Sequence, residues 1–267
     1  RMRGWAELTL AFNHLFFSSQ PVEAASGIER AHELLVTAGD RRGQLLAEIG
    51  SARLLIVQQA PLPARERLMA IREEAMAVLD AEDRFWLLNA LGATYYYADQ
   101  IDEAIRYIYQ ALETLRTVDL SPQLPTVMSN LAAALVTIGD YAPARELAQD
   151  ALEIQSRFNN SQLILFARSN LAEALQGLAD YPAALATVET MLGDASLNDA
   201  RAAQNHYCAI AAEVYAFHKR YDDAAQAVDL ARKIWEAYPG GFNEVNYRWA
   251  EASLAIARDD GAVPLPV

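Results

Sequence analysis

The sequence predicts an all-α fold, a right-handed superhelical solenoid of stacked antiparallel helix hairpins. The 267 residues are rich in strong helix formers and hold only 12 glycines and 10 prolines, and no segment alternates apolar and polar residues as a strand does. An internal repeat supports this class, because an offset of 40 residues aligns six alanines in one column. They are Ala24, Ala64, Ala104, Ala144, Ala184 and Ala224.

Two further columns keep the same phase. Twelve residues before the alanine column, five of six units carry a small residue: Ala52, Gly92, Ala132, Ala172 and Ala212. Phe12 takes this place in the first unit, and Ala252 continues the column into a seventh. Three residues further on, every unit has a large apolar residue: Leu15, Leu55, Tyr95, Leu135, Leu175 and Tyr215. Small residues facing each other let two antiparallel helices approach closely, and large ones then fill the space between hairpins.

Turn residues between the columns set the expected helix bounds. The first helices of the six hairpins are expected at 4–17, 41–58, 81–98, 122–138, 161–178 and 198–218. The second helices are expected at 21–38, 63–80, 101–117, 141–157, 181–193 and 221–237. A lone helix at 242–258 completes a single domain over residues 1–258, and residues 259–267 form a linker or tail.

Charge and cysteine content narrow the partners. The net charge of −13 repels phosphate backbones and anionic lipids, so neither nucleic acid nor a membrane is expected as a partner. The single Cys208 rules out an internal disulfide and fits a reducing, cytoplasmic location. The longest apolar runs are too short to span a bilayer.

Catalytic chemistry is not expected. His14, His32, His206 and His218 do not pair at helical spacing, and no glycine-rich phosphate loop is present. Cys208 lies four residues before Ala212, a core position, where a buried inert thiol is expected. The sequence therefore predicts no enzyme, no cofactor and no metal site.

The columns resemble those of the tetratricopeptide repeat family, with a 40-residue period in place of the family's usual 34. The segments that carry the resemblance are Leu88-Asn89-Ala90-Leu91-Gly92-Ala93-Thr94-Tyr95 with Asp102-Glu103-Ala104-Ile105, and Asn130-Leu131-Ala132 through Gly139-Asp140-Tyr141 with Ala144. The proline usual at the end of the second helix is missing. The segment Asp83-Arg84-Phe85-Trp86-Leu87-Leu88-Asn89-Ala90-Leu91 is similar to repeat regions that precede diguanylate cyclase domains in bacterial signalling proteins.

The resemblance implies a concave peptide-binding surface lined by the first helices. Residues two before and one after the small column would point into it. Asn130 and Asn170 share the first of these positions one repeat apart, where family members use asparagine to hold a peptide backbone. The alternative is that these asparagines are solvated or bridge neighbouring helices.

The charges and aromatic residues on the same surface suggest the class of partner. Arg53, Glu173 and Glu213 occupy the position after the small column, and the two glutamates favour a basic or amide-rich segment over a C-terminal carboxylate. Further candidate groove residues are Asn13, Trp86, Asn89, Tyr96 and Tyr97, although core packing would also explain some of the aromatic ones.

Two functions remain open. The first is a protein- or peptide-binding regulatory or scaffold module of a larger bacterial signalling protein. The second is a structural or dimerisation spacer before an effector domain such as a diguanylate cyclase, with no groove ligand. The lone helix at 242–258 favours the second, because Trp249, Leu254 and Ile256 would leave an apolar edge that a homodimer or a following segment could cover.

Overall fold

The computed structural model describes all residues except 17–20, 119–120, 159–160, 193–204, 240 and 259–267. In this described part, thirteen helices account for all regular structure and no strand is present. The all-α prediction is therefore confirmed. The chain divides into two compact units, residues 1–134 and 135–267, and each is considered by itself.

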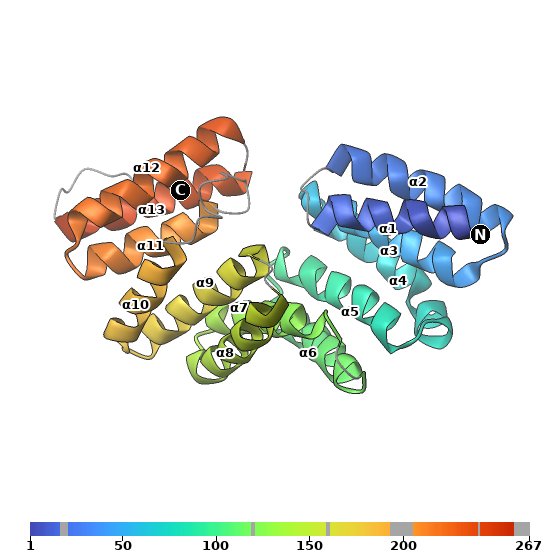
Figure 1. Cartoon of the computed structure of the whole chain (residues 1–267), viewed down its shortest axis with the longest axis horizontal. Coiled ribbons are helices and arrows are strands. Elements are labelled where there is room, and N and C mark those ends of the chain that lie inside the picture. Colours follow the sequence, from blue (N-terminus) through green and yellow to red (C-terminus); the bar gives the residue numbers. More distant parts are fainter. Residues whose placement is uncertain (17–20, 119–120, 159–160, 193–204, 240, 259–267) are drawn as a thin grey trace. The chain divides into compact units, whose positions relative to one another are not determined.

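The first unit contains three hairpins and most of a further helix (Figure 1). Its helices are α1 (Met2–Phe16), α2 (Pro21–Thr37), α3 (Arg41–Val57), α4 (Pro61–Val78), α5 (Ala81–Tyr96), α6 (Ile101–Arg116) and α7 (Leu124–Thr137). The first helices of successive hairpins, α1, α3 and α5, pack in sequence against one another. The first helices therefore form one row, and the second helices pack against this row.

The second unit repeats this arrangement. Its helices are α8 (Tyr141–Phe158), α9 (Ser161–Gly177), α10 (Tyr181–Leu192), α11 (Asn205–Phe217), α12 (Tyr221–Ala237) and α13 (Gly241–Arg258). Helices α9, α11 and α13 pack in sequence as first helices, and α10 and α12 pack on α9 and α11.

The helix bounds lie within two residues of the predicted ones at every end but one. The exception is the start of the sixth first helix, predicted at residue 198, where the described helix begins at Asn205. Residues 198–204 and the predicted tail 259–267 lie outside the described part. The single-domain assignment stays a prediction.

The alanine column lies in the core of both units. All six alanines are 0–1% exposed, and so are Ala52, Ala132, Ala172 and Ala212 of the small column. At Gly92 two helices approach closely, since a Cβ there would lie 2.5 Å from Cγ1 of Ile108 on α6. The small residues therefore set the distance between the helices of a hairpin, as the pattern predicts.

The turn between the two helices of a hairpin is also repeated, in the five hairpins whose turns the structure describes. Residues 59, 99, 139, 179 and 219 all have positive φ, between 58° and 78°. In each turn the next N–H donates to the carbonyl five residues earlier, on Leu55, Tyr95, Leu135, Leu175 or Tyr215, at 2.8–3.0 Å. This is the Schellman ending of a helix. Only one of these positions, Gly139, is a glycine. The carbonyls that accept belong to the large apolar column, so one residue in each repeat both packs and ends the first helix.

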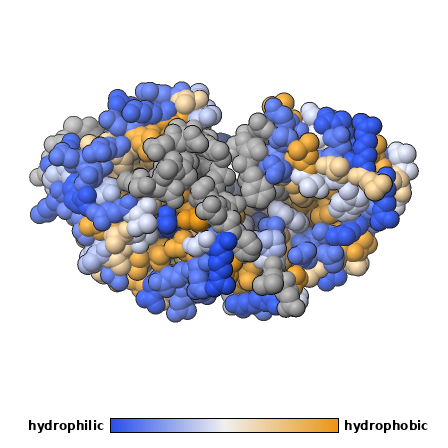
Figure 2. All heavy atoms as spheres, viewed as in Figure 1, coloured by the Kyte–Doolittle hydropathy of each residue, from blue (hydrophilic) through white to orange (hydrophobic). Residues whose placement is uncertain are grey.

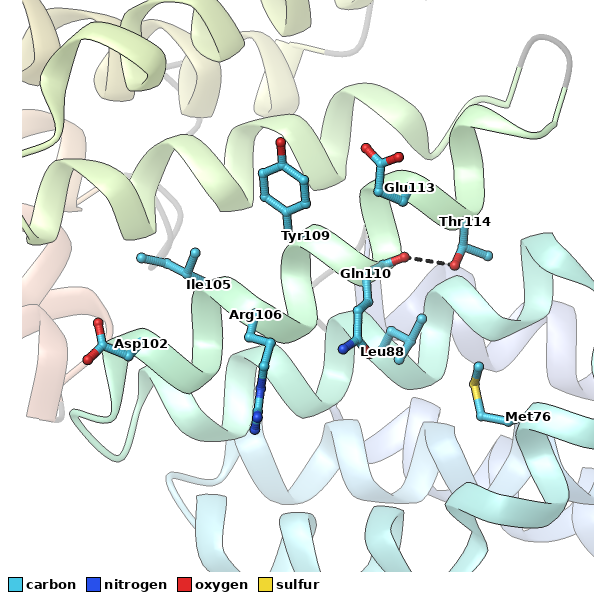
Figure 3. A pocket seen from close by; sticks show the side chains of 9 residues that line it. All are labelled: Met76, Leu88, Asp102, Ile105, Arg106, Tyr109, Gln110, Glu113 and Thr114. Carbon is cyan, nitrogen blue, oxygen red and sulfur yellow. Dashed lines mark hydrogen bonds between the residues drawn. The ribbon is translucent and has the colours of Figure 1, made fainter.

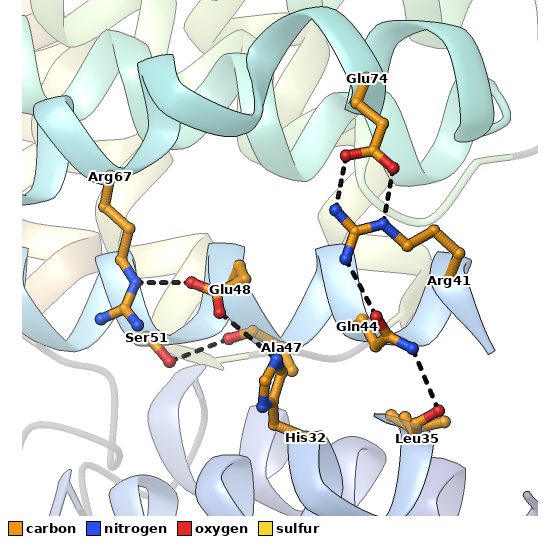
Figure 4. Close-up of polar contacts among 9 residues, drawn as sticks. All are labelled: His32, Leu35, Arg41, Gln44, Ala47, Glu48, Ser51, Arg67 and Glu74. Carbon is orange, nitrogen blue, oxygen red and sulfur yellow. Dashed lines mark hydrogen bonds and ion pairs between the residues drawn. The ribbon is translucent and has the colours of Figure 1, made fainter. Parts of the chain in front are cut away.

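Polar contacts join helices of the first unit, both within a hairpin and between neighbouring hairpins (Figure 4). Arg41 on α3 donates twice to Glu74 on α4, at 2.6 and 2.5 Å. Glu48 on α3 accepts from Arg67 on α4 at 2.6 Å and lies 3.4 Å from His32 on α2. Exposed ion pairs of this kind contribute about 0–1 kcal/mol each, so they add little to the stability of the fold.

The face of the molecule shown in Figure 2 carries both hydrophilic and apolar residues. On the face shown in Figure 2, hydrophilic residues cover most of the periphery of each unit and are interrupted by apolar patches. None of the described helices combines the length and apolar character needed to cross a membrane.

Candidate functional site

The candidate surface is the first-helix face, which we define by the residues one after the small column. They are Asn13, Arg53, Ala93, Ala133, Glu173 and Glu213, and all are exposed or half-buried. The position three residues earlier is mostly inside the packing, with Gly50, Ala90, Asn170 and Ile210 buried, Asn130 half-buried and Leu10 exposed. Of the two predicted columns, the structure therefore leaves mainly the later one accessible to a partner.

An aromatic cluster occupies this face in the first unit. Phe12 on α1 lies over Gly50 on α3, where a Cβ would come 2.7 Å from its ring. The same ring lies 5.6 Å from that of Trp86 on α5, which also contacts Phe85 at 4.9 Å. Phe12 thus fills the space that glycine leaves, and Trp86 stays half-buried.

Arg53 on α3 brings a positive charge to the same face. Burial lowers the pKa of its guanidinium, and nearby Tyr97 partly opposes this. Tyr97 is about half exposed, and its ring lies 5.7 Å from that of half-buried Tyr96. Arg53, Tyr96, Tyr97 and Trp86 therefore all come from α3, α5 and the residue after α5, with part of their surface accessible.

The asparagines bridge helices. Asn130 on α7 donates its Nδ2 to Oδ1 of Asn89 on α5 at 2.7 Å, and Asn89 is 4% exposed. One amide proton of half-buried Asn130 is therefore used inside the protein, while its Oδ1 and second proton can serve a ligand. Asn170 on α9 is 1% exposed, so it lies within the packing of the second unit.

The second unit holds an acidic pair on its first-helix face. Glu173 on α9 and Glu213 on α11 interact closely enough that the charge of Glu213 helps to raise the pKa of Glu173. Burial is the larger cause, and the two together raise that pKa to about 8, although a quarter of the Glu173 side chain stays exposed. Gln176, one turn after Glu173, donates its Nε2 to Glu213 at 2.9 Å. Near neutral pH, Glu173 is therefore mostly protonated and Glu213 is held in place.

An imidazole and an indole adjoin this pair. Nε2 of His206 on α11 lies 3.9 Å from Glu173, and the His206 ring lies 5.7 Å from that of Trp249 on α13. Burial lowers the pKa of His206, and a hydrogen bond with Asn246 opposes the shift. The lowered pKa favours the neutral form of His206, which does not act as a cationic partner for Glu173. We call Glu173, Glu213, Gln176, His206 and Trp249 the acidic site.

Sequence reasoning missed three members of the acidic site. His206 and Trp249 carry no spacing signal, because they lie on different helices and meet only when the hairpins stack. Gln176 could have been found, since it follows Glu173 by three residues and so lies on the same side of the helix.

A pocket of about 600 Å³ lies elsewhere, along α6 (Figure 3). Ile105, Arg106 and Tyr109 line it from α6, with Met76 from α4 and Leu88 from α5. Tyr109 and Glu113 project from the same side of α6 in Figure 3. None of these residues belongs to the first-helix face, so this pocket is separate from the predicted site.

Two observations concern metal ligands and the cysteine thiol. In the part of the chain that the structure describes, no three histidine, cysteine or acidic residues gather as metal ligands would. Cys208 is fully buried, and burial raises the pKa of its thiol to about 12, which makes it unreactive.

Part of the sequence matches a known family of repeats. Residues 83–157 and 123–192 match the family model of the tetratricopeptide repeat. The chain is 30% identical over 126 residues to human tetratricopeptide repeat protein 19, mitochondrial. That match covers 46% of this chain but only about a third (32%) of the length of the human protein.

Solved structures share the fold over almost the whole chain. The apo form of RapI superposes with a TM-score of 0.69 at 15% identity, covering 97% of this chain and 75% of RapI. NprR in complex with its cognate peptide NprX superposes with a TM-score of 0.65 at 14% identity, covering 95% of this chain and 73% of NprR; NprR is a quorum sensor of B. thuringiensis. At such identities the likeness concerns the fold. The family model thus matches residues 83–192, and the solved structures show the same fold over almost the whole chain.

Proposed function

We propose that this chain is a protein- or peptide-binding module whose first-helix face receives a basic or amide-rich segment at the acidic site. The observation that carries the proposal is the pair Glu173 and Glu213. Burial and mutual repulsion make the charged form of Glu173 costly, as its raised pKa of about 8 expresses. A cationic side chain beside the pair would remove this cost, so the site is suited to an arginine or lysine.

Neighbouring groups would complete such a contact. The ring of Trp249 lies beside His206, and aromatic faces attract cations. Half-buried Asn130 in the first unit offers an amide to an extended backbone. The fold likeness to NprR bound to NprX is consistent with a peptide ligand. We infer binding rather than catalysis, since no catalytic set is assembled among the described residues of this face.

A peptide array tests the proposal. The 267-residue chain carries a fluorescent label and is applied to an array of short peptides of random sequence. The sequences of the peptides that bind the labelled chain are then determined. Arginine and lysine should be enriched among them. The double variant Glu173→Gln, Glu213→Gln should lose this enrichment, whereas Glu146→Gln should keep it, because Glu146 lies on second helix α8 and its side chain is 71% exposed. Retention without basic enrichment would refute the proposal.

The wider context belongs to the same proposal. The pattern Asp83–Leu91 favours the regulatory part of a cytoplasmic bacterial signalling protein, including one with a diguanylate cyclase. The alternative function is a structural spacer with no groove ligand. It predicts that the array retains no peptide and that a downstream domain keeps its full activity range when the acidic site is changed.

A further inference from the structure

The acidic site presents hydrogen-bond acceptors on two neighbouring helices. Glu173 on α9 and Glu213 on α11 lie 40 residues apart in the sequence, and α11 packs directly against α9. Oε1 of Glu213 already accepts from Nε2 of Gln176 at 2.9 Å, and its Oε2 is left to a ligand. Nε2 of His206 lies 3.9 Å from Oε2 of Glu173, beyond hydrogen-bond distance. Acceptors on both helices can therefore receive donors from one ligand group placed beside them.

A flat ring adjoins these acceptors. His206 on α11 is next to both Glu173 and Trp249, since its ring lies 5.7 Å from the indole ring. The His206 side chain is 39% exposed, so part of its ring remains accessible. Burial lowers the pKa of His206, and the neutral ring does not repel a cation. A cation can therefore lie against this ring while it contacts the carboxylates.

Arginine and lysine differ in how well they fit this arrangement. The guanidinium group of arginine is planar, carries five N–H donors in its plane and stacks on aromatic rings through its faces. It is also more weakly hydrated than an ammonium group, so it loses less hydration on entering a half-buried site. The lysine ammonium offers three donors on a compact, strongly hydrated charge. A site with acceptors on two helices and a ring beside them therefore suits arginine better.

We propose that the acidic site selects arginine over lysine, with the guanidinium bridging Glu173 and Glu213 and one of its faces against His206. This selection rests on the proposed function, because it names the basic residue that the same site receives. The guanidinium N–H groups donate to Glu173 on one side and to Oε2 of Glu213 on the other. Gln176 holds Glu213 in place for this contact and, being neutral, adds no competing charge.

Matched peptides test the selection. A peptide with one basic residue that the array retains is synthesised with arginine, lysine, asymmetric dimethylarginine or citrulline at that position. Fluorescence anisotropy then measures the affinity of the 267-residue chain for each version. The arginine version should bind roughly tenfold or more tightly than the lysine version, because it makes additional charge-assisted hydrogen bonds. Dimethylarginine keeps the charge but loses donors, so its affinity should fall toward that of lysine, and uncharged citrulline should bind most weakly.

A variant of the site shows where the preference arises. Glu213→Gln removes one of the two carboxylates, so the ratio of arginine to lysine affinity should fall about threefold or more. Glu146→Gln, a change of equal charge on the exposed side of α8, should keep the wild-type ratio. Circular dichroism of both variants checks that their helices are intact.

The outcomes separate this selection from the proposed function. Equal affinity for the arginine and lysine versions would overturn the selection and leave the binding of basic peptides intact. A ratio that Glu213→Gln does not change would also overturn it, because the preference would then arise outside the acidic site. An array without basic enrichment would instead overturn the proposed function, and the selection with it.

Discussion

The repeated turn makes a quantitative prediction about a single backbone position. Ala179 holds φ = 60°, a left-handed conformation that costs a residue with a Cβ about 1–2 kcal/mol. Gly139 holds the equivalent turn one repeat earlier with φ = 78° and carries no such cost. Replacing Ala179 by glycine removes the strain but adds freedom to the unfolded chain, worth about 0.4–1 kcal/mol. The net gain in the free energy of unfolding should be about 0.5–1 kcal/mol.

The reverse change supplies the matched control. Gly139→Ala introduces the same strain in the same turn, and no other atom lies within 3.9 Å to interfere. Both positions belong to the second unit, so both act on the same unfolding transition. Urea unfolding followed by circular dichroism should shift up for Ala179→Gly and down for Gly139→Ala by similar amounts. Shifts of the same sign, or none, would show that these residues do not hold the left-handed turn.

Three further predictions concern individual side chains. Asn130→Ala should lower the free energy of unfolding by about 1–3 kcal/mol, because it leaves the buried Oδ1 of Asn89 without its donor; in urea unfolding, the double change with Asn89→Ala should cost less than the sum of the single ones, and simple additivity would contradict the bond. Glu173→Gln should match the wild type below pH 4.5 and exceed its stability by about 4–5 kcal/mol above pH 8, since the wild type loses stability as Glu173 ionises between its ordinary pKa of 4.5 and its raised pKa of about 8; a difference that does not change with pH would rule out the raised pKa. Cys208 should resist iodoacetamide in the native protein and react after denaturation, given its thiol pKa of about 12, and rapid labelling of the folded chain would contradict its burial.

Much of the fold could be predicted because it depends on residue size at regular spacing. The alanine column and the small column can be recognised in the sequence itself, and both lie in the buried contacts between helices. The turns were located correctly, but their left-handed residue was not evident, since Gln59, Ala179 and Lys219 are residue types that rarely adopt positive φ; only Asp99 is of a type that adopts it more often. Their conformation is imposed by the helices on either side and by the hydrogen bond from the next N–H to the carbonyl of the large apolar residue.

The candidate site was less predictable because it depends on contacts between helices. Asn89 and Asn130 are 41 residues apart, one more than the repeat, so no column aligns them. Asn130 and Asn170 share a column, yet one is half-buried and the other is 1% exposed. Glu173 and Glu213 were found from their column, but the approach of His206 and Trp249 follows from stacking alone.

Proton release on peptide binding tests the central claim most directly. A basic peptide from the array is titrated by calorimetry at pH 7 in two buffers that differ in ionisation enthalpy. If its cation docks beside Glu173 and Glu213, the pKa of Glu173 falls from about 8 toward its ordinary value, and close to one proton should be released per peptide bound. Glu173→Gln should abolish this release and weaken binding. A peptide that binds with no proton release, or equally well to the variant, would show that the acidic site is not where this protein receives its partner.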